Sequence, residues 1–283
     1  MTSNQYPYKT YILFDQTTQS RLAVVPERGA IVTSWQFNGQ EIFYLDQERF
    51  TNPALSVRGG MPILFPICGN LPNDTYTYQG KEFKLKQHGF ARDLPWEVAD
   101  QKPTQLTVVL NSNAQTQAVY PFKFQVIFTY QLAGNTLKIH QRYTNYSPTS
   151  MPFSIGLHPY FLAQDKTQLH FDIPAHQAWD QLTQQTSSFT GSFDWNRDEV
   201  DTALRPLSAP AAIITDRSRN LTISLAYESV YSTLVFWTLK GKEFYCLEPW
   251  SAPRNAINTG EDLTHLAPET CLETSVTLKV NCI

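Results

Sequence analysis

Apolar and polar residues alternate with a period of two along most of this chain, which is the pattern of strands with one buried face. No segment keeps an amphipathic helical period for more than two turns. Two alternating arms flank Ala133-Gly134-Asn135 and predict a β-hairpin. Strands are predicted at Tyr11–Phe14, Leu22–Pro26, Ala30–Phe37, Leu106–Leu110, Phe124–Leu132, Thr136–Thr144, Ala211–Thr215, Leu221–Tyr227, Ser232–Thr238, Glu243–Leu247 and Ser275–Val280. The pattern is least regular over Gln164–Leu204, where we expect long loops.

The number and spacing of these segments indicate an all-β fold. Turn signals recur about every 8–12 residues, which is typical of a large antiparallel sandwich or barrel. The 18 prolines are scattered along the chain, and proline disfavours helices. No internal repeat, low-complexity tract or long linker divides the sequence, so we expect residues 1–283 to form a single domain.

Charge and composition narrow the choice of partners. The 283 residues carry a net charge of −3 without a basic run, which argues against nucleic acid as a partner. No apolar run approaches the ~18 residues of a membrane helix, and the start of the chain lacks the pattern of a signal peptide. The four cysteines lie far apart without a CxxC pair, so we expect buried or free thiols in a reducing compartment. These features predict a soluble cytoplasmic protein that does not bind membranes.

One carboxylate stands in an otherwise apolar run, FYCLEPWSAP (Phe244–Pro253). Alternation places Phe244, Cys246 and Glu248 on one face of a strand, which we expect to end at Pro249. A carboxylate on an apolar face must be paired, hydrogen-bonded or neutralised. Glu248 is therefore a candidate base with a tuned pKa.

The tripeptide Cys-Leu-Glu occurs a second time, at Cys271–Glu273. Alternation in CLETSVTLKV places Glu273 on the face that also carries Ser275, Thr277 and Lys279. We interpret Glu273 as a solvated strand carboxylate without a chemical role.

Two histidines are further candidates. His88 lies in QHGFARDLPW, where Gly89 favours a turn and Arg92 follows; a turn histidine beside a surface ion pair is the alternative. His158 lies in IGLHPYFL, and Pro159 pushes it toward extended backbone at the end of a strand. That position suits acid–base chemistry, and it also suits a core histidine with satisfied hydrogen bonds.

Other chemistries have weaker signals. Gly59-Gly60 after Arg58 can form a turn that meets an anion, but no phosphate-binding helix or lysine follows. His170 and His176 lack the companion ligands of a metal site, and no Gly-x-Ser-x-Gly elbow or dinucleotide fingerprint is present. We expect no metal and no organic cofactor.

Several segments together resemble the galactose mutarotase-like family, which comprises aldose 1-epimerases and their hexose-6-phosphate relatives. The segments that carry the resemblance are RGGMPILFP with CGNLPNDTYTYQGKEF, QHGFARDLPW, GLHPYFL, EVDTAL and CLEPWSAPRNAIN. Their order and spacing span most of the chain, and they assign the family's glutamate to Glu248 rather than Glu273.

The resemblance implies a large antiparallel β-supersandwich and an enzyme, an isomerase that interconverts the anomers of an aldose. It implies that Glu248 is the base and His158 the acid, on opposite sides of one sugar ring. His88 would stabilise charge near the ring oxygen, and Asp201 would bind sugar hydroxyls. For this reaction Glu248 has to be ionised and His158 protonated near neutral pH.

Two alternatives stay open. A hexose-6-phosphate 1-epimerase would use arginines for the phosphate, and Arg58 and Arg92 are the candidates. A sugar-binding or sensing protein on the same scaffold would bind without turnover, although binding alone does not need the pair Glu248 and His158. In each case the ligand is a small sugar or sugar phosphate, and the oligomeric state is not predicted.

Overall fold

The computed structural model describes residues 2–3 and 7–283, most of which lie in or between strands. The predicted hairpin is confirmed, since β11 (Phe124–Ala133) pairs along its whole length with β12 (Thr136–Asn145). Buried positions alternate with more exposed ones along β11, as the sequence predicts. Among the described residues the longest helix, α2 (Ala114–Val119), has six residues, and none could cross a membrane as an apolar helix.

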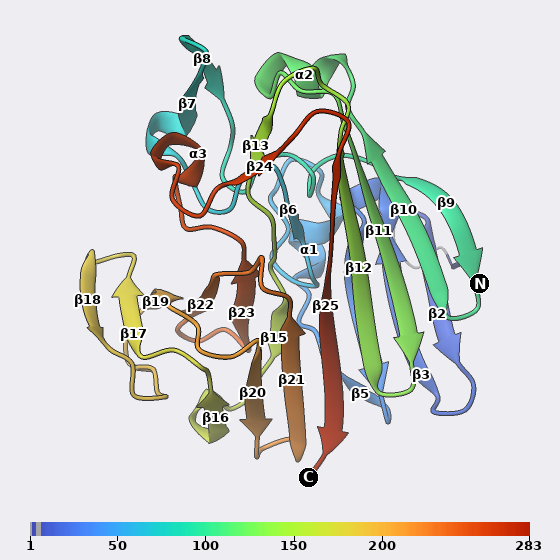
Figure 1. The fold of residues 1–283 in the computed structure, drawn as a ribbon. Helices are drawn as coiled ribbons and strands as arrows, with labels where there is room; N and C mark the ends of the chain where they lie inside the picture. The colour runs from blue at the N-terminus through green and yellow to red at the C-terminus, as the bar shows by residue number, and fades with distance from the viewer. Residues whose placement is uncertain (1, 4–6) are drawn as a thin grey trace.

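The strands form three main sheets and two small pairs, with antiparallel pairings such as those of the long hairpin (Figure 1). The N-terminal sheet has the order β1 (Thr2–Ser3), β2 (Thr10–Asp15), β3 (Ser20–Val25), β4 (Ile31–Phe37) and β5 (Gln40–Glu41). The long-strand sheet has the order β16 (Leu169–Asp172), β20 (Ala211–Asp216), β21 (Leu221–Tyr227), β25 (Cys271–Cys282), β12, β11, β10 (Gln105–Asn111) and β9 (Glu97–Lys102).

The third sheet, called the β22–β23 sheet below, contains the site. Its order is β18 (Gln185–Ser188), β17 (Gln177–Asp180), β19 (Glu199–Leu204), β22 (Thr233–Leu239), β23 (Phe244–Trp250), β14 (Gly156–Leu157) and β6 (Ile63–Leu64), with β15 (Tyr160–Leu162) also paired to β23. The small pairs are β7 (Thr75–Tyr78) with β8 (Lys81–Lys84) and β13 (Met151–Phe153) with β24 (Thr264–Leu266). The remaining elements are α1 (Gln47–Thr51), α3 (Ala256–Thr259) and the 3₁₀ turns η1 (Pro26–Arg28), η2 (Pro72–Asp74) and η3 (Lys166–Gln168).

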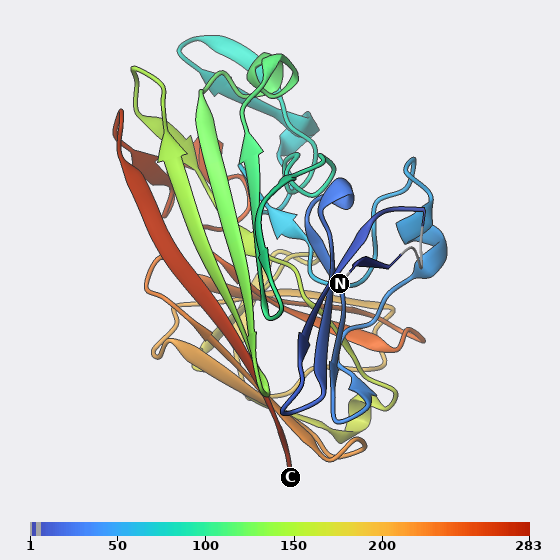
Figure 2. The same cartoon turned by 90° about the vertical axis from the view of Figure 1, so that its right-hand side faces the viewer.

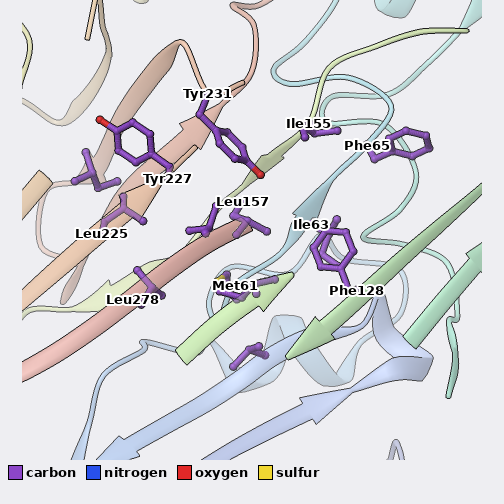
Figure 3. Close-up of a cluster of buried hydrophobic side chains, with 14 of the residues drawn as sticks. Met61, Ile63, Phe65, Phe128, Ile155, Leu157, Leu225, Tyr227, Tyr231 and Leu278 are labelled. Carbon is purple, nitrogen blue, oxygen red and sulfur yellow. The ribbon is translucent and has the colours of Figure 1, made fainter. Parts of the chain in front are cut away.

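The core lies between these sheets. Figure 2 shows the blue N-terminal strands beside the green long strands, and β2 contacts β11. In Figure 3, Met61 and Ile63 from the β6 segment lie in the same cluster of buried side chains as Phe128 of β11, Leu157 of β14 and Leu278 of β25. All five side chains are at most 1% exposed. Burial of apolar area on this scale is the main favourable contribution to folding, and it holds the β6–β14 edge of the β22–β23 sheet against the long-strand sheet.

The prediction of long loops over Gln164–Leu204 is wrong in part. This stretch contains four strands: β16, β17, β18 and β19. The four are short, and β18 is exposed at every position, so burial imposes no apolar alternation on them. Pairing with β20 and β22 defines them instead, and such tertiary pairing is invisible to a local pattern.

The prediction that Pro249 ends its strand is also wrong. β23 continues to Trp250, and Pro249 pairs with Leu234 of β22. Proline is tolerated where its missing N–H faces no partner strand. On the other side of β23 the ladder is interrupted between the pairs Gly156–Trp250 and Tyr160–Cys246, where Leu157, His158 and Pro159 lie. This interruption accommodates the proline and frees the side chain of His158.

Candidate active site

The pairing register brings Glu248 and His158 together. On one edge of β23, the strands β14 and β15 pair with it in a single register on either side of the interruption. The paired residues are Gly156 with Trp250 and Tyr160 with Cys246. Continuing that register across the interruption places His158 directly opposite Glu248. The backbone N–H of His158 donates to the carbonyl of Pro62 on the β6 side, which fixes the backbone at the interruption.

The two side chains are in contact at the floor of a cavity. Nε2 of His158 lies 3.3 Å from Oε1 of Glu248, and Nε1 of Trp250 donates to Oε2 of Glu248 at 3.0 Å. Glu248 is 1% exposed and His158 is 7% exposed. The expectation that they face opposite sides of a sugar ring is wrong, because the structure makes them neighbours. Neighbouring groups suit an anomeric centre, since the ring oxygen and the anomeric hydroxyl are bonded to one carbon.

Burial sets the protonation of this pair. It lowers the pKa of His158 to about 3, and the charges of Arg92 and Arg254 act in the same direction. Burial raises the pKa of Glu248 well above 4.5, against the hydrogen bond from Trp250. The expected ion pair is therefore not the form that burial favours. The favoured form has one proton on Glu248 and a neutral His158, and moving that proton to His158 leaves the charge of the pair unchanged.

His88 approaches the same point from a tight turn, as predicted. Its φ is 67° and that of Gly89 is 71°, and its backbone N–H donates to the carbonyl of Gly69 at 2.7 Å. Nδ1 of His88 accepts a hydrogen bond from the Gly69 N–H at 3.0 Å, and burial lowers the pKa of His88 well below 6.5. The neutral ring therefore carries its proton on Nε2. The rings of His88 and His158 meet edge to face, with centroids 5.4 Å apart.

Asp201 lies on β19 and is held by two donors. Nε2 of Gln181 donates to its Oδ1 at 2.6 Å, and Arg254 donates to its Oδ2 at 2.6 Å. Burial raises the pKa of Asp201, and Arg254 opposes that rise. Arg254 also donates to Oδ1 of Asn70 at 2.9 Å. The result is a fixed row of polar groups along one wall of the cavity.

The cavity has a volume of about 490 Å³ and brings together all six residues that the sequence marked. These are Arg58, His88, Arg92, His158, Asp201 and Glu248. Sequence reasoning did not assign other lining residues, among them Arg49, Asn70, Gln87, Tyr160, Glu199, Trp237, Trp250 and Arg254. Trp250 and Arg254 belong to the CLEPWSAPRNAIN segment, so that segment did carry a signal for them.

The two predicted arginines differ in their contacts. The guanidinium of Arg58 lies over the ring of Trp237, 5.9 Å from its centroid, and has no ion pair among the described residues. Arg92 donates to the carbonyl of Gln87 at 3.1 Å, while its buried Nε has no hydrogen-bond partner within the described chain. Both side chains therefore have donors that are free for a ligand.

Three donor atoms in the site lie close enough to bind a metal ion. One ligand atom each of His158, Cys246 and Glu248 lies within 4.8 Å of the others. Zinc would need the thiolate of Cys246, and burial raises the pKa of that thiol well above 9.0. The state that burial favours is thus a neutral thiol packed on the apolar face of β23. All four cysteines are free thiols, as predicted.

Replacing Gly69 by alanine should disturb both His88 and Arg254. Gly69 has a φ of 73°, and an added Cβ would lie 2.3 Å from Cγ of Arg254. We expect a loss of about 1–2 kcal/mol of unfolding free energy from the backbone alone, together with a displaced Arg254. Gly80→Ala is the matched control, since Gly80 has a φ of 75° and nothing within 4 Å of its added Cβ. Urea unfolding of both variants should show the larger loss of unfolding free energy for Gly69→Ala. Equal losses would mean that the added Cβ at position 69 does not clash with Arg254.

Comparison with known proteins agrees with this fold. The family model described as Aldose 1-epimerase matches residues 13–278, so the chain belongs to the aldose 1-epimerase family. It is similar to the solved structure of Slr1438 protein from Synechocystis sp. PCC 6803, with 46% identity, a TM-score of 0.95, and coverage of 97% of this chain and 96% of that one. A galactose mutarotase related enzyme from Lactobacillus acidophilus has the same fold at 24% identity, with a TM-score of 0.80 and coverage of 96% and 97%. A protein from Cenchrus ciliaris, provisionally named a glucose-6-phosphate 1-epimerase, is 26% identical over 238 residues, which are 76% of this chain and 67% of that protein.

Proposed function

We propose that the protein is a mutarotase that interconverts the α and β anomers of an aldose, with Glu248 and His158 as the acid–base pair. The observation that carries the proposal is their 3.3 Å contact at the floor of a cavity lined by polar side chains. The cavity of about 490 Å³ lies within the usual size range of small-ligand sites. Family membership supports an isomerase reaction on a sugar.

The one-proton pair suits ring opening. With the proton on His158, the carboxylate of Glu248 removes the proton of the anomeric hydroxyl while His158 protonates the ring oxygen. The bond between C1 and the ring oxygen breaks, and an open-chain aldehyde forms. Glu248 then holds a proton and His158 is neutral, which is the form that burial favours. Rotation about C1–C2 and the reverse transfers close the ring on its other face.

The surrounding groups have supporting roles in this proposal. The Nε2–H of His88 is a neutral donor that can stabilise negative charge near the ring oxygen. Asp201 and Arg254, held to each other at 2.6 Å, offer an acceptor and a donor to sugar hydroxyls. Fixed polar groups of this kind need little reorganisation during the reaction.

The test is the optical rotation of freshly dissolved α-glucose and α-galactose. We expect the wild-type protein to accelerate equilibration in proportion to its concentration. Tight sugar binding without acceleration would contradict the proposal and favour a sugar-binding protein instead.

A sugar phosphate is a second candidate substrate, because Arg58 and Arg92 line the cavity and have N–H donors that are free to bind a phosphate. A guanidinium matches the geometry of a phosphate, and hydrogen bonds to charged groups contribute about 1.5–3 kcal/mol. We expect Arg58→Gln to raise KM for glucose 6-phosphate about 10–100-fold, and to raise KM for glucose much less. Arg217→Gln is the control, since Arg217 is exposed and lies outside the cavity. Equal effects of Arg58→Gln on both sugars would argue for a free aldose.

A further inference from the structure

Arg28 is a buried arginine that the proposed mechanism does not use. It belongs to η1 and is 6% exposed. It has no ion pair with any residue of 2–3 and 7–283, and its buried Nε has no hydrogen-bond partner among them. A buried charge without a counter-charge is costly, and an apolar side chain would often fill the same place at lower cost. The contacts that this guanidinium does make therefore indicate its role.

Among the described residues, the hydrogen bonds of Arg28 go to residues 52–57, called the 52–57 loop below. Nη2 of Arg28 donates to the carbonyl of Leu55 at 2.6 Å and to that of Asn52 at 3.2 Å. Within the loop, the backbone N–H of Leu55 donates to the carbonyl of Asn52 at 3.1 Å. The guanidinium therefore binds both ends of one turn, through hydrogen bonds of the stronger, charge-assisted class.

Few other contacts hold this loop. None of its six residues is buried, and only Leu55 and Val57 are half-buried. Val57 packs against the small apolar cluster of Val25, Ile31 and Phe50. Exposed backbone with few apolar contacts has low local stability. We therefore expect the two bonds from Arg28 to be a large part of what orders the loop.

The loop forms one side of the catalytic cavity. Four residues in or next to it line that cavity, namely Arg49, Ser56, Val57 and Arg58. Nε of Arg49 donates to the carbonyl of Ser56 at 3.0 Å, so a displaced loop would move Arg49 as well. The acid–base pair is on other elements, β23 and the interruption beside it. A change in the loop should therefore alter ligand binding and leave the acid–base pair in place.

The turn that carries Arg28 also contacts the segment of Arg92. Gly29 ends η1 with a φ of 72°, and its backbone N–H donates to the carbonyl of Leu94 at 3.1 Å. A Cβ added at Gly29 would lie 2.1 Å from the carbonyl oxygen of Arg92. One turn therefore adjoins both segments that bring the predicted arginines to the cavity, that of Arg58 through Arg28 and that of Arg92 through Gly29.

We propose that Arg28 is a positioning residue for substrate binding, which holds the 52–57 loop and the arginines beside it at the catalytic cavity. This inference rests on the proposed function. Arg28 is not among the residues that line the cavity, so it acts through the loop. If the loop keeps its binding geometry only part of the time, the apparent affinity for the substrate falls by that fraction.

The test is the mutarotation kinetics of Arg28→Met, with whichever of α-glucose, α-galactose and glucose 6-phosphate the wild-type protein accelerates most. Methionine is a long side chain without N–H donors. We expect KM to rise about fivefold to twentyfold and kcat to stay within about twofold of the wild type. Hydrogen exchange at the amides of Ala54 and Leu55, both hydrogen-bonded within the loop, should become faster. Arg28→Lys keeps the charge on a shorter side chain, so its KM should lie between the two.

Arg219→Met is the matched control. Arg219 also donates to two backbone carbonyls, those of Leu162 and Glu41, and neither residue lines the cavity. Its removal should lower the free energy of unfolding and leave both KM and the exchange of the 52–57 loop unchanged. That is the behaviour of an arginine with a structural role alone. An unchanged KM in a folded and active Arg28→Met, whether or not the loop exchanges faster, would overturn the inference and leave the proposed function standing.

Arg28→Lys keeps the inference testable if Arg28→Met does not fold. A raised KM with an unchanged kcat in Arg28→Lys would then support positioning, and wild-type values of both would overturn it. If the wild-type protein accelerates the mutarotation of none of the three sugars, the proposed function fails, and the role of Arg28 in substrate binding fails with it.

Discussion

Glu248→Gln is expected to lower kcat/KM for mutarotation by about 10²–10⁴-fold, the usual contribution of one positioned acid–base group. Glutamine has nearly the same shape, and its carbonyl oxygen can still accept the hydrogen bond from Nε1 of Trp250. It cannot take the proton of the anomeric hydroxyl. The loss should therefore appear mainly in kcat, measured by polarimetry on freshly dissolved α-glucose.

The second Cys-Leu-Glu tripeptide provides the control for this substitution. The side chain of Glu273 is 71% exposed on β25 and lies 3.7 Å from Arg142, itself 50% exposed. Ion pairs this exposed contribute little. Glu273→Gln should leave the rate unchanged and the fold intact. Wild-type activity in Glu248→Gln, or an equal loss in Glu273→Gln, would remove Glu248 from the mechanism.

The contrast between these two glutamates was predictable because strand alternation is a local property. Period two alone placed Glu248 on an apolar face and Glu273 among serine, threonine and lysine. The structure has Glu248 1% exposed and Glu273 exposed. The same reasoning predicted the β11–β12 hairpin, since its turn and both arms are contiguous in sequence.

Features that depend on partners distant in sequence were not predictable in this way. Gln181 reaches Asp201 only because β17 and β19 pair, and no local pattern marks a glutamine as a ligand. The alignment of Glu248 with Val235 and Ala203 across three strands is likewise a product of register between strands. The depth at which His158 is buried was not predictable for a related reason. Burial depends on the whole fold, and here it opposes an imidazolium.

The pair Glu248 and His158 also predicts how the free energy of unfolding depends on pH. Folding lowers the pKa of His158 to about 3, so between about pH 4.5 and 6.5 only the unfolded state protonates it. Folding raises the pKa of Glu248, so the folded state keeps that proton to a higher pH than the unfolded state does. The two effects have opposite signs. In the wild-type protein they oppose each other, so the slope from the pair is smaller than the slope from either group alone.

Single substitutions should reveal the separate contributions of His158 and Glu248 to this pH dependence. In Glu248→Gln the histidine is left alone, and the unfolded state binds one more proton than the folded state. This group should then lower stability by ~1.4 kcal/mol for each unit of decreasing pH. In His158→Asn the glutamate is left alone, the folded state binds the extra proton, and the slope should change in the opposite direction, by at most ~1.4 kcal/mol per unit. Burial is the largest cause of the lowered pKa of His88 and is present in all three proteins, so most of its effect drops out of the differences.

The measurement is guanidinium unfolding of the wild type and both variants at about pH 5 and about pH 6, where the two side chains differ in protonation between the folded and unfolded states. His170→Gln serves as the control, since His170 is exposed and its removal should leave the slope unchanged. Opposite changes in the two variants would mean that burial forces each group to its neutral form when its partner is removed. Equal slopes in all proteins would mean that water or structural relaxation solvates the charged forms, and the pair would then lack the tuned proton on which ring opening depends.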